Sequence, residues 1–170
     1  FFDFSNFAKI ISILKGKNFC IDENTCSIFN ESIIKSKFLI RSRKDPCYFL
    51  KSIKNKKELQ NIKLAHIKDG VALTKFIYLF KNKKTKWTEL KAVKLLENLR
   101  KKNNNYLYPS FNTIAGSGPN SAIIHYKSNP STNRIIKKKD IFLLDSGGQY
   151  KYGTTDVTRT LCQKKPKKFI

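Results

Sequence analysis

Hydrophobic residues recur at helical intervals after residue 55, and this pattern begins at a recognisable helix cap. Asn55 and Glu58 have the spacing of a capping box, in which each side chain satisfies the exposed backbone amide of the other residue. We therefore expect a helix over residues 56–81. His66 falls on its apolar face, so it is expected to pack at the edge of the core rather than to bind a ligand. The other residues of that face are Leu59, Ile62, Leu73, Phe76 and Phe80.

A second helix is predicted to begin near Thr88, a good N-cap residue, and to end within residues 101–105. Its expected buried stripe consists of Leu90, Val93, Leu96 and Leu99. After Tyr106 the pattern is typical of β-structure, with a turn expected at residues 116–119 and a strand-like segment at 122–126. The order of elements is thus helix, helix and then strands.

The last predicted strands contain the polar residues of greatest interest. Residues 141–145 are predicted to form a buried strand, because four apolar residues precede the carboxylate of Asp145. Residues 146–152 are expected to continue or bend this strand. Residues 154–161 alternate about Val157 and are predicted to form a further strand.

The N-terminal part of the chain has a different organisation. Residues 1–45 begin with a helical pattern and continue with short apolar segments at 19–21 and 38–40, which is typical of the end of an α/β unit. The charged stretch 41–46 closes on a proline, which disfavours helix at the preceding residue. We therefore expect two domains, residues 1–45 and residues 47–170.

Composition limits the class of protein. The 170 residues contain no methionine, so we expect the chain to be a piece of a longer protein. No run of about 18 consecutive apolar residues is present, so no membrane partner is expected. The net charge of +23 comes from lysines spread along the whole chain, whereas a nucleic-acid footprint is clustered on one face. No specific nucleic-acid partner is expected.

The four cysteines, Cys20, Cys26, Cys47 and Cys162, lack the CxxC spacing and the nearby histidine pair of a zinc or redox motif. Reduced structural thiols are the favoured interpretation. They fit a cytoplasmic protein.

Two aspartates could carry chemistry. Asp145 ends an apolar run, and burial of a carboxylate there would be costly unless it were paired, hydrogen-bonded or bound to a metal. Asp156 follows eleven residues later, and glycines 147, 148 and 153 would allow a bend between the two. If the two strands are neighbours, both carboxylates can point into one pocket. Such oxygen ligands suit manganese or magnesium, or a mixed site for zinc or cobalt.

The run from Asp145 to Thr160 closely resembles the first metal-ligand segment of the pita-bread metallopeptidases, in the X-prolyl aminopeptidase (aminopeptidase P) branch. Further segments that resemble this branch are 65–72, 113–114, 117–126 and 132–134. The resemblance covers about residues 47–161. It implies an α+β fold, the N-terminal half of a pita-bread catalytic domain. Residues 1–45 more loosely resemble the end of the preceding α/β, creatinase-like domain.

The resemblance also implies roles for individual residues. Asp145 would bind one metal ion through both oxygens, and Asp156 would bridge two divalent ions, with Mn²⁺ first in order and Zn²⁺ or Co²⁺ as alternatives. His125 would line the substrate pocket as a catalytic and substrate-binding residue, not as a metal ligand. The implied substrates are peptides with an N-terminal X-Pro sequence. Residue by residue, the alternatives stay open: the aspartates could be strand-end residues, and His125 could be structural.

The chain departs from the family pattern after Asp156. A complete site needs one further histidine and two glutamates, but no histidine or acidic residue follows in this sequence. The 170 residues alone are therefore expected to be inactive. A methionine aminopeptidase-like activity and a catalytically dead binding module are the alternative functions. Homodimerisation of the complete protein is left open.

Overall fold

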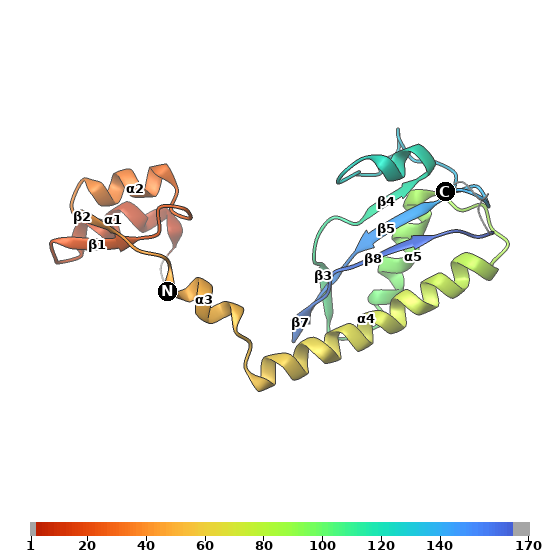
Figure 1. Cartoon of the computed structure of the whole chain (residues 1–170), viewed down its shortest axis with the longest axis horizontal. Helices are drawn as coiled ribbons and strands as arrows, with labels where there is room; N and C mark the ends of the chain where they lie inside the picture. Colours follow the sequence, from red (N-terminus) through yellow and green to blue (C-terminus); the bar gives the residue numbers. More distant parts are fainter. Residues whose placement is uncertain (1–2, 165–170) are drawn as a thin grey trace. The chain divides into compact units, whose positions relative to one another are not determined.

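The computed structural model describes residues 3–164. The chain forms two compact units, Phe1–Lys54 and Asn55–Ile170, whose elements are shown in Figure 1. The apolar segment 19–21 and residues 39–40 of the second apolar segment lie in a pair of parallel strands of the first unit. Its elements are η1 (Phe4–Asn6), α1 (Phe7–Ile13), β1 (Asn18–Ile21), α2 (Ile28–Lys35), β2 (Leu39–Ser42) and α3 (Pro46–Ser52). A small core of Ile11, Ile21, Ile34 and Phe38 lies between α1, α2 and the two strands.

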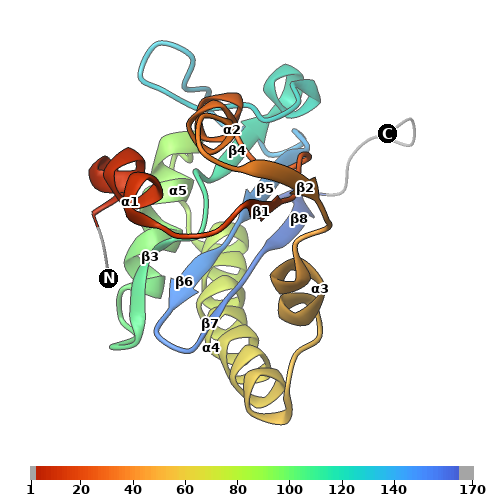
Figure 2. The same cartoon turned by 90° about the vertical axis from the view of Figure 1, so that its left-hand side faces the viewer.

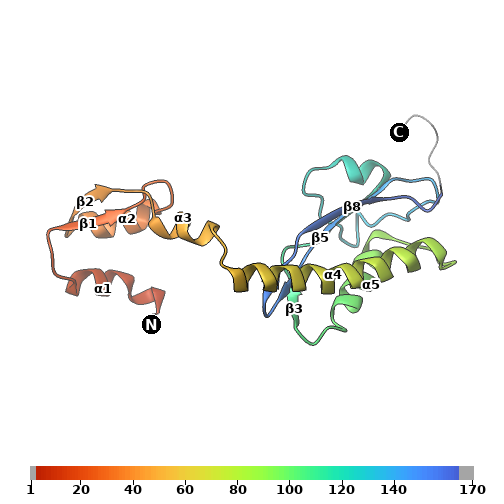
Figure 3. The same ribbon diagram turned by 60° about the horizontal axis from the view of Figure 1, so that its bottom comes forward.

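The second unit begins with two helices, α4 (Lys56–Asn82) and α5 (Glu89–Arg100), which pack against each other (Figure 3). The predicted capping box is confirmed: the Asn55 side chain accepts a hydrogen bond from the Glu58 amide at 2.9 Å, and the Glu58 carboxylate accepts one from the Asn55 amide at 2.8 Å. Thr88 caps α5 by accepting a hydrogen bond from the Lys91 amide. Both helix starts are thus fixed by local sequence.

Antiparallel strands make up the rest of this unit (Figure 2). One sheet has the order β3-β6-β7 and the other has the order β4-β5-β8. The elements are β3 (Tyr106–Pro109), β4 (Ile114–Ser117), η2 (Gly118–Ala122), β5 (Phe142–Ser146), β6 (Gly148–Tyr150), β7 (Gly153–Thr154) and β8 (Val157–Leu161). The core lies between both helices and one face of the β4-β5-β8 sheet, with Phe76, Phe80, Leu96, Phe142 and Leu144 at its centre.

Three expectations about these elements are wrong in detail. Segment 122–126 is not a strand, because it leaves η2 through a turn in which His125 has a φ of 53°. His66 is exposed, and its Nδ1 lies 2.9 Å from the carbonyl oxygen of Ile62. The fully buried face of α5 differs from the predicted stripe because two charged residues on it have partners inside the protein. That face consists of Glu89, Ala92, Leu96 and Arg100.

No helix within residues 3–164 combines the length and the apolar character needed to cross a bilayer.

Candidate metal centre

The two candidate ligands lie on adjacent strands. Asp145 in β5 pairs with Thr158 in the antiparallel strand β8, and Asp156 precedes Thr158 by two residues. Side chains alternate between the faces of a sheet, so Thr158 shares a face with Asp145, and the same alternation carried one residue before the start of β8 puts Asp156 on that face. The two aspartates are therefore diagonal neighbours, an arrangement with a Cα separation of about 7–8 Å. The two strands are thus neighbours, which is the condition under which the sequence allows both carboxylates to share a pocket.

That face is the one turned away from the helices. In β5 the residues Phe142, Leu144 and Ser146 are buried, whereas Asp145 is half-buried and Asp156, just before β8, is exposed. Both carboxylates thus remain accessible, while the opposite face of the sheet packs on the core. The hydroxyl of Thr158 donates a hydrogen bond of 2.8 Å to Oδ1 of Asp145, which fixes the orientation of that carboxylate.

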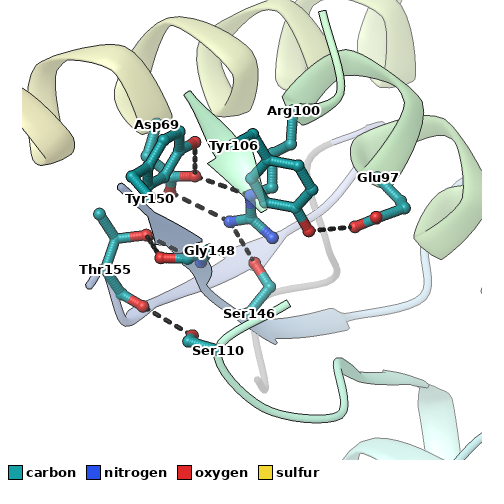
Figure 4. A network of polar contacts seen from close by, with 9 residues as sticks. All are labelled: Asp69, Glu97, Arg100, Tyr106, Ser110, Ser146, Gly148, Tyr150 and Thr155. Carbon is teal, nitrogen blue, oxygen red and sulfur yellow. Dashed lines mark hydrogen bonds and ion pairs between the residues drawn. The ribbon is translucent and has the colours of Figure 1, made fainter. Parts of the chain in front are cut away.

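The residue next to each aspartate is buried and held by hydrogen bonds (Figure 4). Thr155 is 1% exposed, its hydroxyl accepts a hydrogen bond of 2.9 Å from the Gly148 amide, and its carbonyl accepts one of 2.8 Å from the Ser110 hydroxyl. A Cβ at Gly147 would meet the Thr155 carbonyl oxygen at 1.9 Å, so only glycine permits this close approach. The bend after β5 is therefore rigidly packed against the residue before Asp156.

Ser146, the residue after Asp145, contacts a buried ion pair that the sequence analysis did not predict. The Arg100 guanidinium donates hydrogen bonds to both Asp69 oxygens, at 2.7 and 3.0 Å, and to the Ser146 hydroxyl at 3.1 Å (Figure 4). Tyr150 also donates to Asp69, at 2.8 Å, and burial followed by this hydrogen bond raises the pKa of the Tyr150 hydroxyl. The available signal was Asp69 itself, which falls on the apolar face of α4.

His125 is exposed and lies in the turn after η2. Its positive φ is uncommon for a residue with a side chain, and such conformations gather at functional sites. Among the described residues, no hydrogen bond joins His125 to Asp145 or Asp156. The structure thus brings the two aspartates together by strand pairing and leaves His125 on a separate segment.

The donor set fits part of a divalent metal site. Two carboxylates on one sheet face supply the hard oxygen ligands that Mn²⁺ and similar ions accept. Within residues 3–164, however, no group of three or more histidine, cysteine, aspartate or glutamate side chains is placed to hold an ion. Asp145 and Asp156 can therefore provide only some of the ligands such an ion needs.

Known proteins have sequences similar to this chain. Residues 60–169 match metallopeptidase family M24. A probable Xaa-Pro aminopeptidase P of Paracoccidioides lutzii is 45% identical over 122 residues, which are 69% of this chain and 20% of that protein. The counterpart from Paracoccidioides brasiliensis strain Pb18 is 44% identical with the same coverage. The chain thus spans about a fifth of the length of these relatives.

Solved structures of X-Pro peptidases are similar to this chain in fold. The X-prolyl aminopeptidase of Caenorhabditis elegans, described as a cytosolic enzyme with a di-nuclear active site, superposes with a TM-score of 0.72 at 33% identity, over 81% of this chain and 23% of that one. The prolidase of Pyrococcus horikoshii gives a TM-score of 0.77 at 24% identity, over 96% of this chain and 46% of that one, and supports the fold. The second unit is therefore a portion of the mixed α and β pita-bread domain, and the chain belongs to metallopeptidase family M24 as a homologue of Xaa-Pro aminopeptidase P.

Proposed function

We propose that this chain is part of a metal-dependent aminopeptidase that releases the N-terminal residue from peptides with proline in the second position. The observation that carries the proposal is the placement of Asp145 and Asp156 as diagonal neighbours on the accessible face of β5 and β8. The similarity to Xaa-Pro aminopeptidase P relatives, at 45% identity over 122 residues, supplies the substrate class. A cytosolic location is proposed by analogy with the C. elegans enzyme.

In this proposal the two aspartates hold a pair of divalent ions. Asp145, whose carboxylate is oriented by Thr158, and Asp156 would be the residues of this chain that hold the ions. Mn²⁺ is the first choice of metal, with Zn²⁺ and Co²⁺ as alternatives. Bound ions of this kind lower the pKa of a shared water and polarise the scissile carbonyl. The proposed role of His125 is to contact the substrate and to hold a proton near the reacting carbonyl.

The 170 residues themselves are expected to be inactive. Two carboxylates fill too few of the coordination positions of two metal ions to hold them. Neither a histidine nor an acidic residue follows Asp156 in this sequence to supply further ligands. Isothermal calorimetry of the 170-residue chain with MnCl₂ should therefore detect no stoichiometric binding at micromolar affinity. Stoichiometric uptake at that affinity would show that the chain holds a complete site.

Peptide hydrolysis tests the proposal directly. The longest natural product that contains this sequence should cleave X-Pro peptides, with lower turnover on X-Ala peptides and on peptides that begin with methionine. Asp145→Asn and Asp156→Asn should each lower kcat/KM by more than about a hundredfold, because loss of a ligand exceeds the effect of an outer-shell change. Asp3→Asn makes the same chemical change at an exposed position outside the site and is the matched control.

The outcome separates the remaining candidates. A strong preference for initiator methionine would assign a methionine aminopeptidase-like activity. Full activity after replacement of both aspartates would refute the metal mechanism. Absence of any hydrolysis, in a product that supplies the further histidine and glutamates, would favour a binding module that has lost catalysis.

A further inference from the structure

Helix α5 carries a buried charged residue at each end. Glu89, its first residue, is 0% exposed, and Arg100, its last residue, is 1% exposed. Buried charges are expensive unless every polar atom has a partner. The partners at the two ends of α5 belong to two different parts of the candidate site.

The Glu89 carboxylate holds one irregular segment, residues 117–134. Its oxygens accept hydrogen bonds from two backbone amides, those of Ser117 at 2.8 Å and Arg134 at 3.1 Å. They also accept bonds from the side chains of Asn120, at 3.0 and 3.2 Å, and of Tyr126, at 3.0 Å. Among the described residues, no lysine, arginine or histidine forms an ion pair with this carboxylate.

The segment and the carboxylate therefore depend on each other. A carboxylate without a cation can stay buried only when its oxygens accept hydrogen bonds. The donors to Glu89 named here all lie on the one segment, residues 117–134. That segment carries His125, the residue before the buried Tyr126. Because Tyr126 is anchored to Glu89, the backbone at His125 is held in its left-handed conformation although its side chain is exposed.

At the other end, Arg100 reaches the strand of the first aspartate. Its guanidinium is fixed by Asp69 of α4 and donates to the hydroxyl of Ser146, the neighbour of Asp145 (Figure 4). Ser146 lies on the helix side of β5, so its anchor sets the position of the backbone that presents Asp145 on the other side.

We propose that α5 is a positioning helix with two separable ends: Glu89 positions the His125 segment for substrate, and Arg100 positions β5 for metal. The assignment of substrate and metal to the two ends rests on the proposed function. The claim that the two ends act separately does not depend on the proposed function.

Hydrogen exchange of the 170-residue chain tests the separation, because it reports local opening without metal or substrate. Tyr126→Phe removes one donor to Glu89, and exchange within residues 117–134 should become about tenfold faster, the effect of losing one hydrogen bond to a charged group. Strands β5 and β8 should keep their protection. Ser146→Ala should have the opposite pattern, with faster exchange in β5 and an unchanged His125 segment.

Tyr106→Phe is the matched control. Tyr106 is also buried, and its hydroxyl donates a 2.7 Å hydrogen bond to Glu97, a carboxylate in the last turn of the same helix that holds neither the His125 segment nor β5. This variant should change neither region. If Tyr126→Phe and Ser146→Ala loosen both regions alike, or if neither variant loosens its own region, the two-ended role of α5 is wrong.

A second readout uses the catalytically complete product. Tyr126→Phe should raise KM or lower kcat at unchanged metal affinity, whereas Ser146→Ala should weaken metal binding about tenfold, as expected for an outer-shell partner. The milder Glu89→Asp should reproduce the Tyr126→Phe pattern. Separate exchange effects without any hydrolysis would reject the proposed function and leave the positioning helix standing. Hydrolysis of X-Pro peptides, with equal effects of both variants on KM and on metal affinity, would support the proposed function and reject the positioning helix.

Discussion

Removal of Arg100 gives the sharpest test of how this unit is held together. The side chains of Arg100 and Asp69 are 1% and 3% exposed, and Arg100 donates to both oxygens of Asp69. Arg100→Met keeps the aliphatic volume but leaves the Asp69 carboxylate buried with the Tyr150 hydroxyl as a single donor. Breaking a buried pair by removal of one partner costs about 3–5 kcal/mol, because a buried charge is left uncompensated.

That amount is a large share of the total stability of about 5–15 kcal/mol that is typical of a domain. Urea unfolding of the 170-residue chain, followed by far-UV circular dichroism, should show a lower midpoint for Arg100→Met with an unchanged slope. Lys101→Met is the matched control, because Lys101 forms a surface pair with Glu97 at 3.5 Å and its side chain is 62% exposed. This control should lose less than about 1 kcal/mol.

The double variant Arg100→Met with Asp69→Leu completes a thermodynamic cycle. Replacement of both partners by apolar groups removes the stranded charge, so the double variant should recover part of the stability that Arg100→Met loses. The buried hydroxyls of Tyr150 and Ser146 would then each lack a partner, which leaves a deficit of about 2 kcal/mol. A loss below about 1 kcal/mol for Arg100→Met, or a double variant as unstable as the two single losses combined, would refute this reasoning.

Two further outcomes are expected in the same unfolding assay. Gly147→Ala should destabilise the protein by about 1–3 kcal/mol or more, because its Cβ would overlap the Thr155 carbonyl oxygen. Gly70→Ala, in the middle of α4, has nothing within 4 Å of its added Cβ and should stabilise the protein by about 0.4–1 kcal/mol. Equal effects of the two variants would contradict the packing argument. Burial raises the pKa of Tyr126 and of Tyr150 in the folded protein above the unfolded value of about 10. A group whose pKa is raised by folding stabilises the folded state fully below its unfolded pKa. This stabilisation is lost as the pH rises through the folded pKa. Between pH 9 and 11 the free energy of unfolding should therefore fall less steeply for Tyr150→Phe than for the unchanged chain, and parallel curves would exclude this contribution.

The parts of the fold that the sequence predicts are those with local causes. The capping box at Asn55 and the cap at Thr88 use partners three residues away, and both helix starts agree with the structure. Strands β5 and β8 fall in the two segments that the apolar pattern predicts as strands. Each of these signals is complete within a short window of sequence, so no knowledge of the rest of the chain is needed.

Buried charges were not predictable in this way. The predicted stripe of α5 contained only apolar residues, and charged residues such as Glu89 and Arg100 are mostly exposed in proteins. Their burial depends on partners distant in sequence, with Asp69 31 residues before Arg100 and Ser146 46 residues after it. For the same reason the predicted strand at 122–126 is wrong, since hydrogen bonds to Glu89 hold that segment in an irregular path. The candidate ligands were visible from the sequence, but the residues that hold them were not.

The residues next to the two aspartates show how the site uses both faces of the sheet. Asp145 is followed by Ser146, whereas Asp156 is preceded by Thr155, so the order of ligand and anchor is reversed between the two strands. The register pairs Asp145 with Thr158, two residues after Asp156, so the alternation of side chains puts both aspartates on one face and their buried neighbours, Ser146 and Thr155, on the other. A one-residue slip of β8 against β5 would turn a carboxylate toward the core and an anchor toward solvent. The spacing of the aspartates therefore encodes which face of the sheet presents each of them as well as their distance apart.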